Sequence, residues 1–353
     1  MNDDLRAFVE TLRRALRERY DAADLLRREG RARQFDGDVY RMLMEELGVG
    51  MLLEPGAGGA GFGAEGLAEV FESFGWALYD GPYLNHLLCA QALALLEGGG
   101  TKAAHDGLAE LGAVALAWCA PGSGWENMAP LQGQVDDDAI VVSGSRTRVV
   151  DGDLATSFLA PVQVDSEVLL AFFPSNCVLV GAPPSLDLAR SCATVSFDAA
   201  RGRVIGRLVE DAHAQLRARF CLAAAAELTG VGRRCLDMSA EYAKTRYQFG
   251  RPIGSFQAVK HKAAEMTARV AEMRAVVAAA VAANRPPTSL MAAAVCAEAA
   301  FANAQDCIQI HGGIGFTWEH TAHLFYRRAA AWRALLPSGA THLELYLQDQ
   351  LAS

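Results

Sequence analysis

Long helical stretches, broken at one place by a short loop, constrain this chain more than any other feature of its sequence. Residues 209–246 keep a helical composition for about 40 residues, about 60 Å if unbroken, with only two glycines. The loop TRYQFGRPIGSFQAV follows at residues 245–259, and helical patterns resume at residues 256–284 and 289–313. Helices of this length with short connections pack as antiparallel bundles, so the sequence predicts a helical bundle here.

The rest of the chain divides into two zones of different composition. Residues 1–114 carry apolar residues at helical spacing, for example Leu5, Phe8, Val9, Leu12 and Leu16. Residues 115–205 change to short β-branched and aromatic runs between turn residues, which is typical of antiparallel strands. We therefore predict a mostly α protein with a central antiparallel β domain: an N-terminal helical domain (1–114), a barrel-like middle domain (115–205) and a C-terminal four-helix bundle (206–353).

Composition excludes several classes of function. No uncharged apolar run reaches the ~20 residues of a membrane-spanning helix, and the acidic start MNDDLRAFVE is unlike a signal peptide. The net charge is −9 without a basic block, which argues against a nucleic-acid partner. Eight single cysteines without a CxxC pair fit reduced thiols better than disulfides or zinc. We expect a cytoplasmic protein without membrane insertion, nucleic acid or metal.

Two motifs about 60 residues apart resemble those of the acyl-CoA dehydrogenase family. RYQFGRPIGSFQAVKHKAAEM, residues 246–266, resembles its bundle motif, with an Arg, a Phe-Gly and a Phe-Gln between two long helices. QIHGGIGFTWEHTAHLFYRRA, residues 309–329, resembles its Gln-x-x-Gly-Gly-x-Gly-Phe motif followed by Arg. The three-zone layout extends the resemblance over nearly the whole chain.

The resemblance implies a flavoprotein in which FAD lies between two subunits. It carries over residue by residue to six cofactor-binding candidates, which are Arg246, Phe249, Gln257, Gln309, Gly312 and Gly313. An arginine fork suits a pyrophosphate, and Gly-Gly allows close backbone approach to a ligand. The family further implies an acyl-CoA substrate, an oligomer and electron-transfer flavoprotein as electron acceptor. Bundle helices rich in Ala and Val on more than one face also favour burial against a neighbouring chain.

The catalytic base of the family is missing from both of its usual positions. Such enzymes remove the α-proton of the thioester with a Glu while the β-hydride passes to the flavin. Ser338, followed by Gly and Ala, stands where most members have Glu-Gly-Thr, and Phe220 stands at the alternative position on the first bundle helix. Glu227 lies two turns further along that helix, about 10 Å away, which is too far to replace the base. The catalytic residue is therefore unassigned.

The strand segment that cradles flavin within the same subunit also departs from the family pattern. WCAPGSGWEN has Ala120 and Trp125 where the family's Thr-Glu-Pro-Gly-x-Gly-Ser has Glu and Ser. The family's Trp-Ile-Thr is replaced by Arg148, Val149 and Val150. The half-site for a flavin in the same subunit is thus damaged, and the half-site offered to a neighbouring subunit is intact.

This asymmetry resembles the shorter, base-lacking subunit of bacterial heteromeric acyl-CoA dehydrogenases, some of which act on fatty-acyl or steroid side-chain thioesters. The leading hypothesis is a subunit that lends flavin-binding residues to a partner carrying the catalytic Glu. Two alternatives stay open: a homotetrameric dehydrogenase with an unrecognised base, and a non-catalytic assembly subunit. The sequence does not identify the acyl group.

Overall fold

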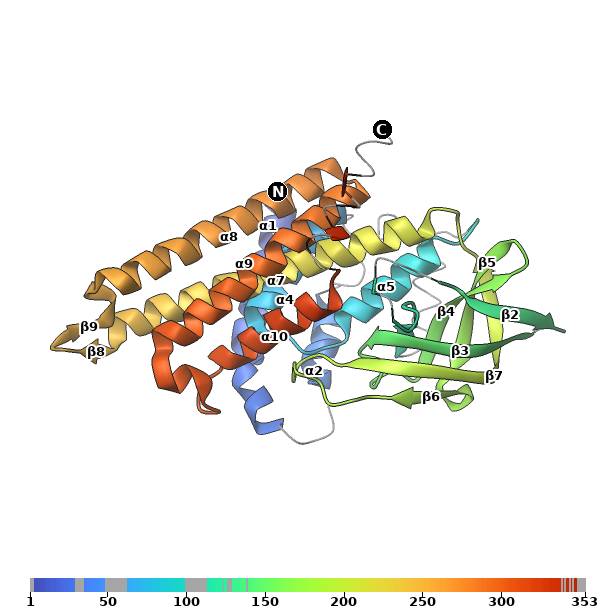
Figure 1. Ribbon diagram of the computed structural model, residues 1–353, viewed down its shortest axis with the longest axis horizontal. Coiled ribbons are helices and arrows are strands. Elements are labelled where there is room, and N and C mark those ends of the chain that lie inside the picture. The colour runs from blue at the N-terminus through green and yellow to red at the C-terminus, as the bar shows by residue number, and fades with distance from the viewer. Residues whose placement is uncertain are drawn as a thin grey trace.

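The computed structural model describes residues 3–28, 35–47, 62–98, 113–122, 124–125, 129–137, 139–337, 339, 341–342, 344 and 346–347. Within this part of the chain, two groups of helices pack together and a β domain lies at one end of them (Figure 1). The helix–strand–helix order agrees with the predicted fold class. No helix among the described residues is long and apolar enough to cross a membrane.

The N-terminal helices form where apolar residues recur every three or four positions. Helix α1 buries Leu5, Val9, Leu12 and Leu16, which confirms four of the five residues of the predicted stripe, and Phe8 is half-buried. The other elements of this group are η1 (Ala22–Arg28), α2 (Gly37–Arg41), the π-helix η2 (Met42–Glu46), α4 (Gly63–Ala77) and α5 (Tyr83–Ala94), after α1 (Asp3–Arg19).

The strands of the β domain close into a barrel. In the described residues they form one seven-stranded sheet, in which β4, β2, β3, β7 and β5 pair in a ring because β5 also pairs with β4. Most pairings are antiparallel, as predicted, but β4 runs parallel to both β1 and β2. The strands are β1 (Val114–Leu116), β2 (Leu131–Asp136), β3 (Ala139–Val150), β4 (Ser157–Val164), β5 (Glu167–Pro174), β6 (Val178–Gly181) and β7 (Cys192–Arg207).

The C-terminal bundle is built on one unusually long helix. Helix α7 (Ala212–Thr245) extends from the β domain to the opposite end of the molecule, where the hairpin β8–β9 projects (Figure 1). The chain then returns along α8, comes back along α9 and turns into the short helix α10. The bounds are β8 (Tyr247–Gln248), β9 (Arg251–Pro252), η4 (Ile253–Ser255), α8 (Gln257–Ala283), α9 (Pro286–His311), η5 (Gly312–Phe316) and α10 (Ala322–Leu335).

Helices α4 and α7 cross at two glycines, one from each helix. A Cβ atom on Gly75 would lie 1.9 Å from the backbone oxygen of Glu227, and one on Gly230 would lie 2.0 Å from that of Glu72. Any side chain at these positions would push the helix backbones apart. This contact sets how closely the N-terminal helices approach the middle of α7.

We predict that Gly230→Ala destabilises the protein by about 1–3 kcal/mol, although alanine favours helix over glycine. The reason is that the obstructing atom belongs to the backbone of α4 and cannot rotate away. Urea unfolding would measure the change. Gly37→Ala is the control, because a Cβ atom there meets nothing within 4 Å. Equal stabilities of the two variants would contradict the close crossing.

Candidate functional site

The loop between α7 and α8 forms a tight hairpin that exposes an aromatic side chain. Gln248 pairs with Arg251, so Phe249 and Gly250 form a two-residue turn, with φ of 52° and 77°. Such turns need positive φ at both positions, which suits glycine but is unfavourable for phenylalanine. The side chain of Phe249 is 91 % exposed. The chain therefore keeps a strained aromatic residue in solvent, a feature that is more common at functional sites than elsewhere.

The structure brings the two motifs to the same end of the bundle. Arg246 ends α7 and Gln257 begins α8, whereas Gln309 lies in the last turn of α9, and all three are exposed. The ring of His311 stacks on Tyr242 with centroids 4.4 Å apart, which joins the ends of α9 and α7. We call this surface the hairpin end and define it by Arg246, Phe249, Gln257, Gln309, Gly312 and Gly313.

The hairpin end combines positive charge with accessible backbone. Lys244, Arg251 and Lys260 are exposed close to Arg246 in the chain. A Cβ atom on Gly312 or Gly313 would meet nothing within 4 Å, so the backbone there is open to solvent. Cationic side chains and uncovered backbone are the groups that bind a phosphate-containing ligand.

A column of adjacent aromatic rings, stacked except for a tilted last pair, fills the opposite end of α7, beside the β domain. We call it the aromatic column. Its ring centroids follow at 5.6 Å, 6.1 Å, 4.0 Å and 5.5 Å, in the order His213, Trp118, Trp125, Phe220 and Trp332. The four larger rings are almost completely buried.

The closest pair in the column joins two of the positions that depart from the family motifs. The rings of Trp125 and Phe220 are nearly parallel, at 6°. The sequence resemblance assigns Trp125 to the place of a motif serine and Phe220 to the alternative base position. The sequence revealed each substitution separately, and the fold shows that they form one contact. Ser338, at the other base position, lies outside the described residues.

The replaced Trp-Ile-Thr segment lies in β3 beside the same region. Arg148 has φ of 53° at an irregularity of the β3–β7 pairing, and its guanidinium donates to the backbone oxygen of Leu335 at 3.4 Å. Val149 and Val150 are buried in the domain. The arginine thus holds the end of α10, and the segment offers neither an aromatic face nor a hydroxyl.

Glu227 is part of a buried group of charges. Arg328 bonds to Asp187 and Glu227, and Arg190 donates to the other oxygen of Glu227 at 2.8 Å. The guanidinium of Arg190 also lies over Trp332, 4.7 Å from the ring centroid, so this group adjoins the aromatic column. We call Asp187, Arg190, Glu227 and Arg328 the charge cluster.

The charge cluster makes Glu227 unsuitable as a catalytic base. Burial raises the pKa of Glu227, but the charges and hydrogen bonds of Arg190 and Arg328 outweigh it and hold the pKa below its ordinary value. Burial lowers the pKa of Arg328, and the two carboxylates raise it above its ordinary value. Glu227 is therefore a fixed carboxylate with both oxygens engaged. Arg190 and Asp187 come from the loop between β6 and β7, far from Glu227 in the chain, so no local pattern indicated them as its neighbours.

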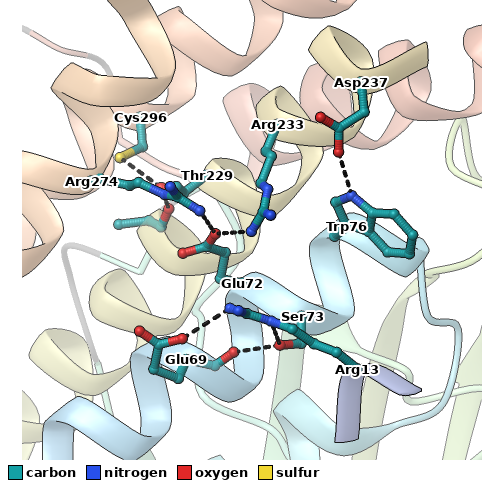
Figure 2. A network of polar contacts seen from close by, with 11 residues as sticks. Arg13, Glu69, Glu72, Ser73, Trp76, Thr229, Arg233, Asp237, Arg274 and Cys296 are labelled. Carbon is teal, nitrogen blue, oxygen red and sulfur yellow. Dashed lines mark hydrogen bonds and ion pairs between the residues drawn. The ribbon is translucent and has the colours of Figure 1, made fainter. Parts of the chain in front are cut away.

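A second polar network ties the N-terminal helices to the bundle (Figure 2). Glu72 accepts from Arg233 at 3.3 Å and from Arg274 at 2.6 Å, and Arg13 donates to Glu69 at 2.9 Å. The indole of Trp76 donates to Asp237 at 2.8 Å, as Figure 2 also shows. The network borders a cavity of about 660 Å³ between α4, α7 and α8. Every charge named here has a partner, so we interpret the network as a structural connection between the N-terminal helices and the bundle.

Comparison with known proteins agrees with this architecture. Residues 189–343 match the family described as acyl-CoA dehydrogenase, C-terminal domain. The chain is 32% identical to the acyl-CoA dehydrogenase IpdE2 of Mycolicibacterium smegmatis, over 86% of this chain and 84% of the relative. It is 34% identical to IpdE2 of Mycobacterium tuberculosis over 87% and 84%. The chain belongs to the acyl-CoA dehydrogenase family.

Solved structures of the family share the fold along the whole chain. The ChsE4–ChsE5 complex of Mycobacterium tuberculosis superposes with a TM-score of 0.83 at 26% identity, covering 100% of this chain and 98% of that one. The steroid acyl-CoA dehydrogenase Tcur3481–Tcur3483, in a G363A variant, gives a TM-score of 0.86 at 23% identity, over 99% of both chains.

Among the described residues, no group of three or more His, Cys, Asp or Glu side chains is placed to hold a metal ion.

We predict that Arg328→Met destabilises the protein by about 3–5 kcal/mol, because it leaves Asp187 and Glu227 buried without their shared cation. Chemical denaturation at neutral pH would measure this loss. The control is Arg333→Met on the same helix, which breaks an exposed pair with Glu298 and should cost less than about 1 kcal/mol. Similar losses in the two variants would contradict the role given to the charge cluster.

Proposed function

We propose that this chain is the shorter, base-lacking subunit of a heteromeric acyl-CoA dehydrogenase. In this assembly it lends the hairpin end to FAD held by a partner subunit. The partner supplies the Glu that removes the α-proton of an acyl-CoA thioester, and electron-transfer flavoprotein accepts the electrons. The proposal rests mainly on the contrast between the two ends of α7. The end beside the β domain is filled by buried rings, whereas the hairpin end presents exposed, positively charged groups.

The end beside the β domain does not fit a flavin of the chain's own. Trp125 and Phe220 stack at 4.0 Å in a buried position, which leaves no space between them for a third ring. Both residues stand at positions where the family has a polar or acidic group. The one carboxylate two turns away, Glu227, is held by two arginines. Neither Trp125 nor Phe220 supplies a base, and their contact leaves no open ring face between them for a flavin.

The hairpin end has the groups that the cofactor would need from a neighbour. Arg246 is exposed and permanently charged, so it can form a bidentate contact with a pyrophosphate. The uncovered backbone of Gly312 and Gly313 permits close approach of the adenosine half. Phe249 provides an exposed aromatic face that a bound nucleotide and a partner would bury together. FAD, when bound, supplies the hydride acceptor, and this chain contributes binding and orientation.

Exposed alanines on α8 also favour a partner chain. In this single chain the helix buries only a narrow stripe, formed by Met266, Val270, Met273, Val277 and Ala280. Its outer face carries exposed alanines, including Ala264, Ala268, Ala271, Ala275 and Ala278. Small apolar side chains in solvent permit a second helix to approach closely. The ChsE4–ChsE5 structure is a complex of two named chains, which is consistent with such an arrangement.

We predict that Arg246→Ala weakens FAD retention ten- to a hundredfold in the complex with the partner, which corresponds to about 1.5–3 kcal/mol. The reason is the loss of a charge-assisted contact to phosphate. Flavin absorbance of the complex after dialysis would measure retention. Lys244→Ala, which removes an exposed charge two residues earlier, is the control and should retain flavin. An Arg246→Ala complex that keeps FAD as well as the parent would rule out the contact.

We also predict that the chain alone does not oxidise acyl-CoA substrates, because both base positions lack a carboxylate and the aromatic column fills the flavin side. The measurement is anaerobic bleaching of added FAD with short, long and steroid-type acyl-CoAs. Phe220→Glu should restore little, since a base acts only on a substrate beside a seated flavin. Rapid bleaching by the parent chain would support a homomeric enzyme. Absence of flavin even from the complex with the partner would support an assembly subunit.

A further inference from the structure

A surface groove borders the second half of α7, beside the ends of α1 and α4. Its volume is about 510 Å³, which is within the range of small-ligand sites. Four helices line it: α1 with Arg17, α4 with Trp76, α7 with side chains from Arg234 to Thr245, and α9 with its last residue, His311. A ligand in the groove would therefore contact helices that are far apart in the sequence.

Two guanidinium groups of the groove lie over the same indole ring. The Cζ atom of Arg17 is 5.0 Å from the ring centroid of Trp76, and the Cζ atom of Arg234 is 4.5 Å from it. Such a contact attracts each cation to the ring, and a guanidinium still has N–H donors at its edge for an acceptor. Trp76 thus gathers two positive charges, one from α1 and one from α7.

Neither arginine has an ion-pair partner in the described part of the chain. Two carboxylates line the groove, but Asp237 is bound by the indole of Trp76, which donates to it at 2.8 Å (Figure 2). Glu241 is exposed and pairs with neither guanidinium. The N–H donors of Arg17 and Arg234 are therefore available to a ligand.

The pKa values of two groups in the groove agree with a positive potential near the indole. Burial lowers the pKa of Arg234 below its ordinary value, Asp237 opposes this effect, and the charge of Arg17 lowers the pKa further. Burial also lowers the pKa of His320, and His311 and Arg234 add to the decrease. Repulsion among these groups costs free energy, and a bound anion would offset that cost.

We propose that this groove binds a phosphate group between Arg17 and Arg234. The planar fork of a guanidinium matches phosphate oxygens and can donate two hydrogen bonds to them at once. Trp76 holds both guanidinium groups near one point, so little side-chain order is lost on binding. The groove has room for more than the phosphate itself. Inorganic phosphate, a mononucleotide and the 3′-phosphate of coenzyme A all carry this chemistry.

The groove is distinct from the hairpin end. Tyr242 and His311 line the groove, whereas the six residues that define the hairpin end do not. The proposal rests on the contacts of Arg17, Trp76 and Arg234, so it depends neither on FAD nor on a partner subunit. Bound phosphate would link α1 to α7, and a ligand that binds only the folded chain raises its stability.

The test measures binding of inorganic phosphate, AMP and coenzyme A to the folded full-length chain by isothermal titration calorimetry. Ionic strength is held constant, because salt screens exposed charges. Arg17→Gln and Arg234→Gln should each weaken binding about tenfold or more. Glu241→Gln should strengthen it, because that change removes a carboxylate that repels an anion. Adenosine, which lacks the phosphate, should not bind, and the tightest of the three probes indicates the source of the phosphate.

Arg14→Gln is the matched control, because it removes an exposed charge from the same helix as Arg17 but outside the groove. This variant should bind phosphate as the parent does. Phosphate should also raise the unfolding temperature of the parent chain but not that of Arg234→Gln. Circular dichroism would confirm that each variant is folded.

Three results would overturn the inference. One is the absence of binding for all three phosphate probes. Another is an equal loss of affinity in Arg17→Gln, Arg234→Gln and Arg14→Gln, which would indicate a general effect of net charge. The third is phosphate binding that is lost in Arg246→Ala and kept in Arg234→Gln, which would assign the phosphate to the hairpin end and leave the proposed FAD contact intact.

Discussion

The buried bond of Arg328 to Glu227 and Asp187 is the interaction on which the arrangement of this molecule depends. It joins α10, the middle of α7 and the loop before β7, three segments far apart in the chain. Each of these charges would be costly to bury alone, so the cluster forms only when all three segments are in place. Arg190 of the charge cluster also contacts Trp332, and this contact fixes the last ring of the aromatic column. The β domain and the bundle are thereby locked at one relative position.

The charge cluster also has a chemical consequence. A carboxylate with both oxygens bound by guanidinium groups, and with its pKa held low, does not exchange protons with a substrate near neutral pH. The rings of Trp125 and Phe220 close the space next to it. The end of α7 beside the β domain is thus a packed core. Under the proposed function, the contribution of this chain lies at the other end of α7, in groups that face outwards.

At the hairpin end, in contrast, the side chains are not packed. Its side chains are exposed, Phe249 adopts a conformation that is unfavourable for a non-glycine residue, and a glycine pair leaves backbone uncovered. Exposure and positive φ do not by themselves favour the isolated chain. Under the proposed function a ligand and a second chain cover these groups. The ring of His311, stacked on Tyr242, joins the two motif segments from inside the bundle.

The sequence by itself determined the class of fold and the location of the hairpin end. Helical periodicity and strand alternation are local properties, and the two motifs keep their spacing whatever surrounds them. It also led to the prediction that Phe220, Trp125 and Arg148 depart from the family motifs. Only the tertiary structure decided what these departures do. Stacking of Trp125 on Phe220 and the bonds of Glu227 to Arg190 and Arg328 join residues from distant segments. Such contacts depend on how closely whole helices approach, and that distance is set by packing at glycines such as Gly75 and Gly230, which no local pattern encodes.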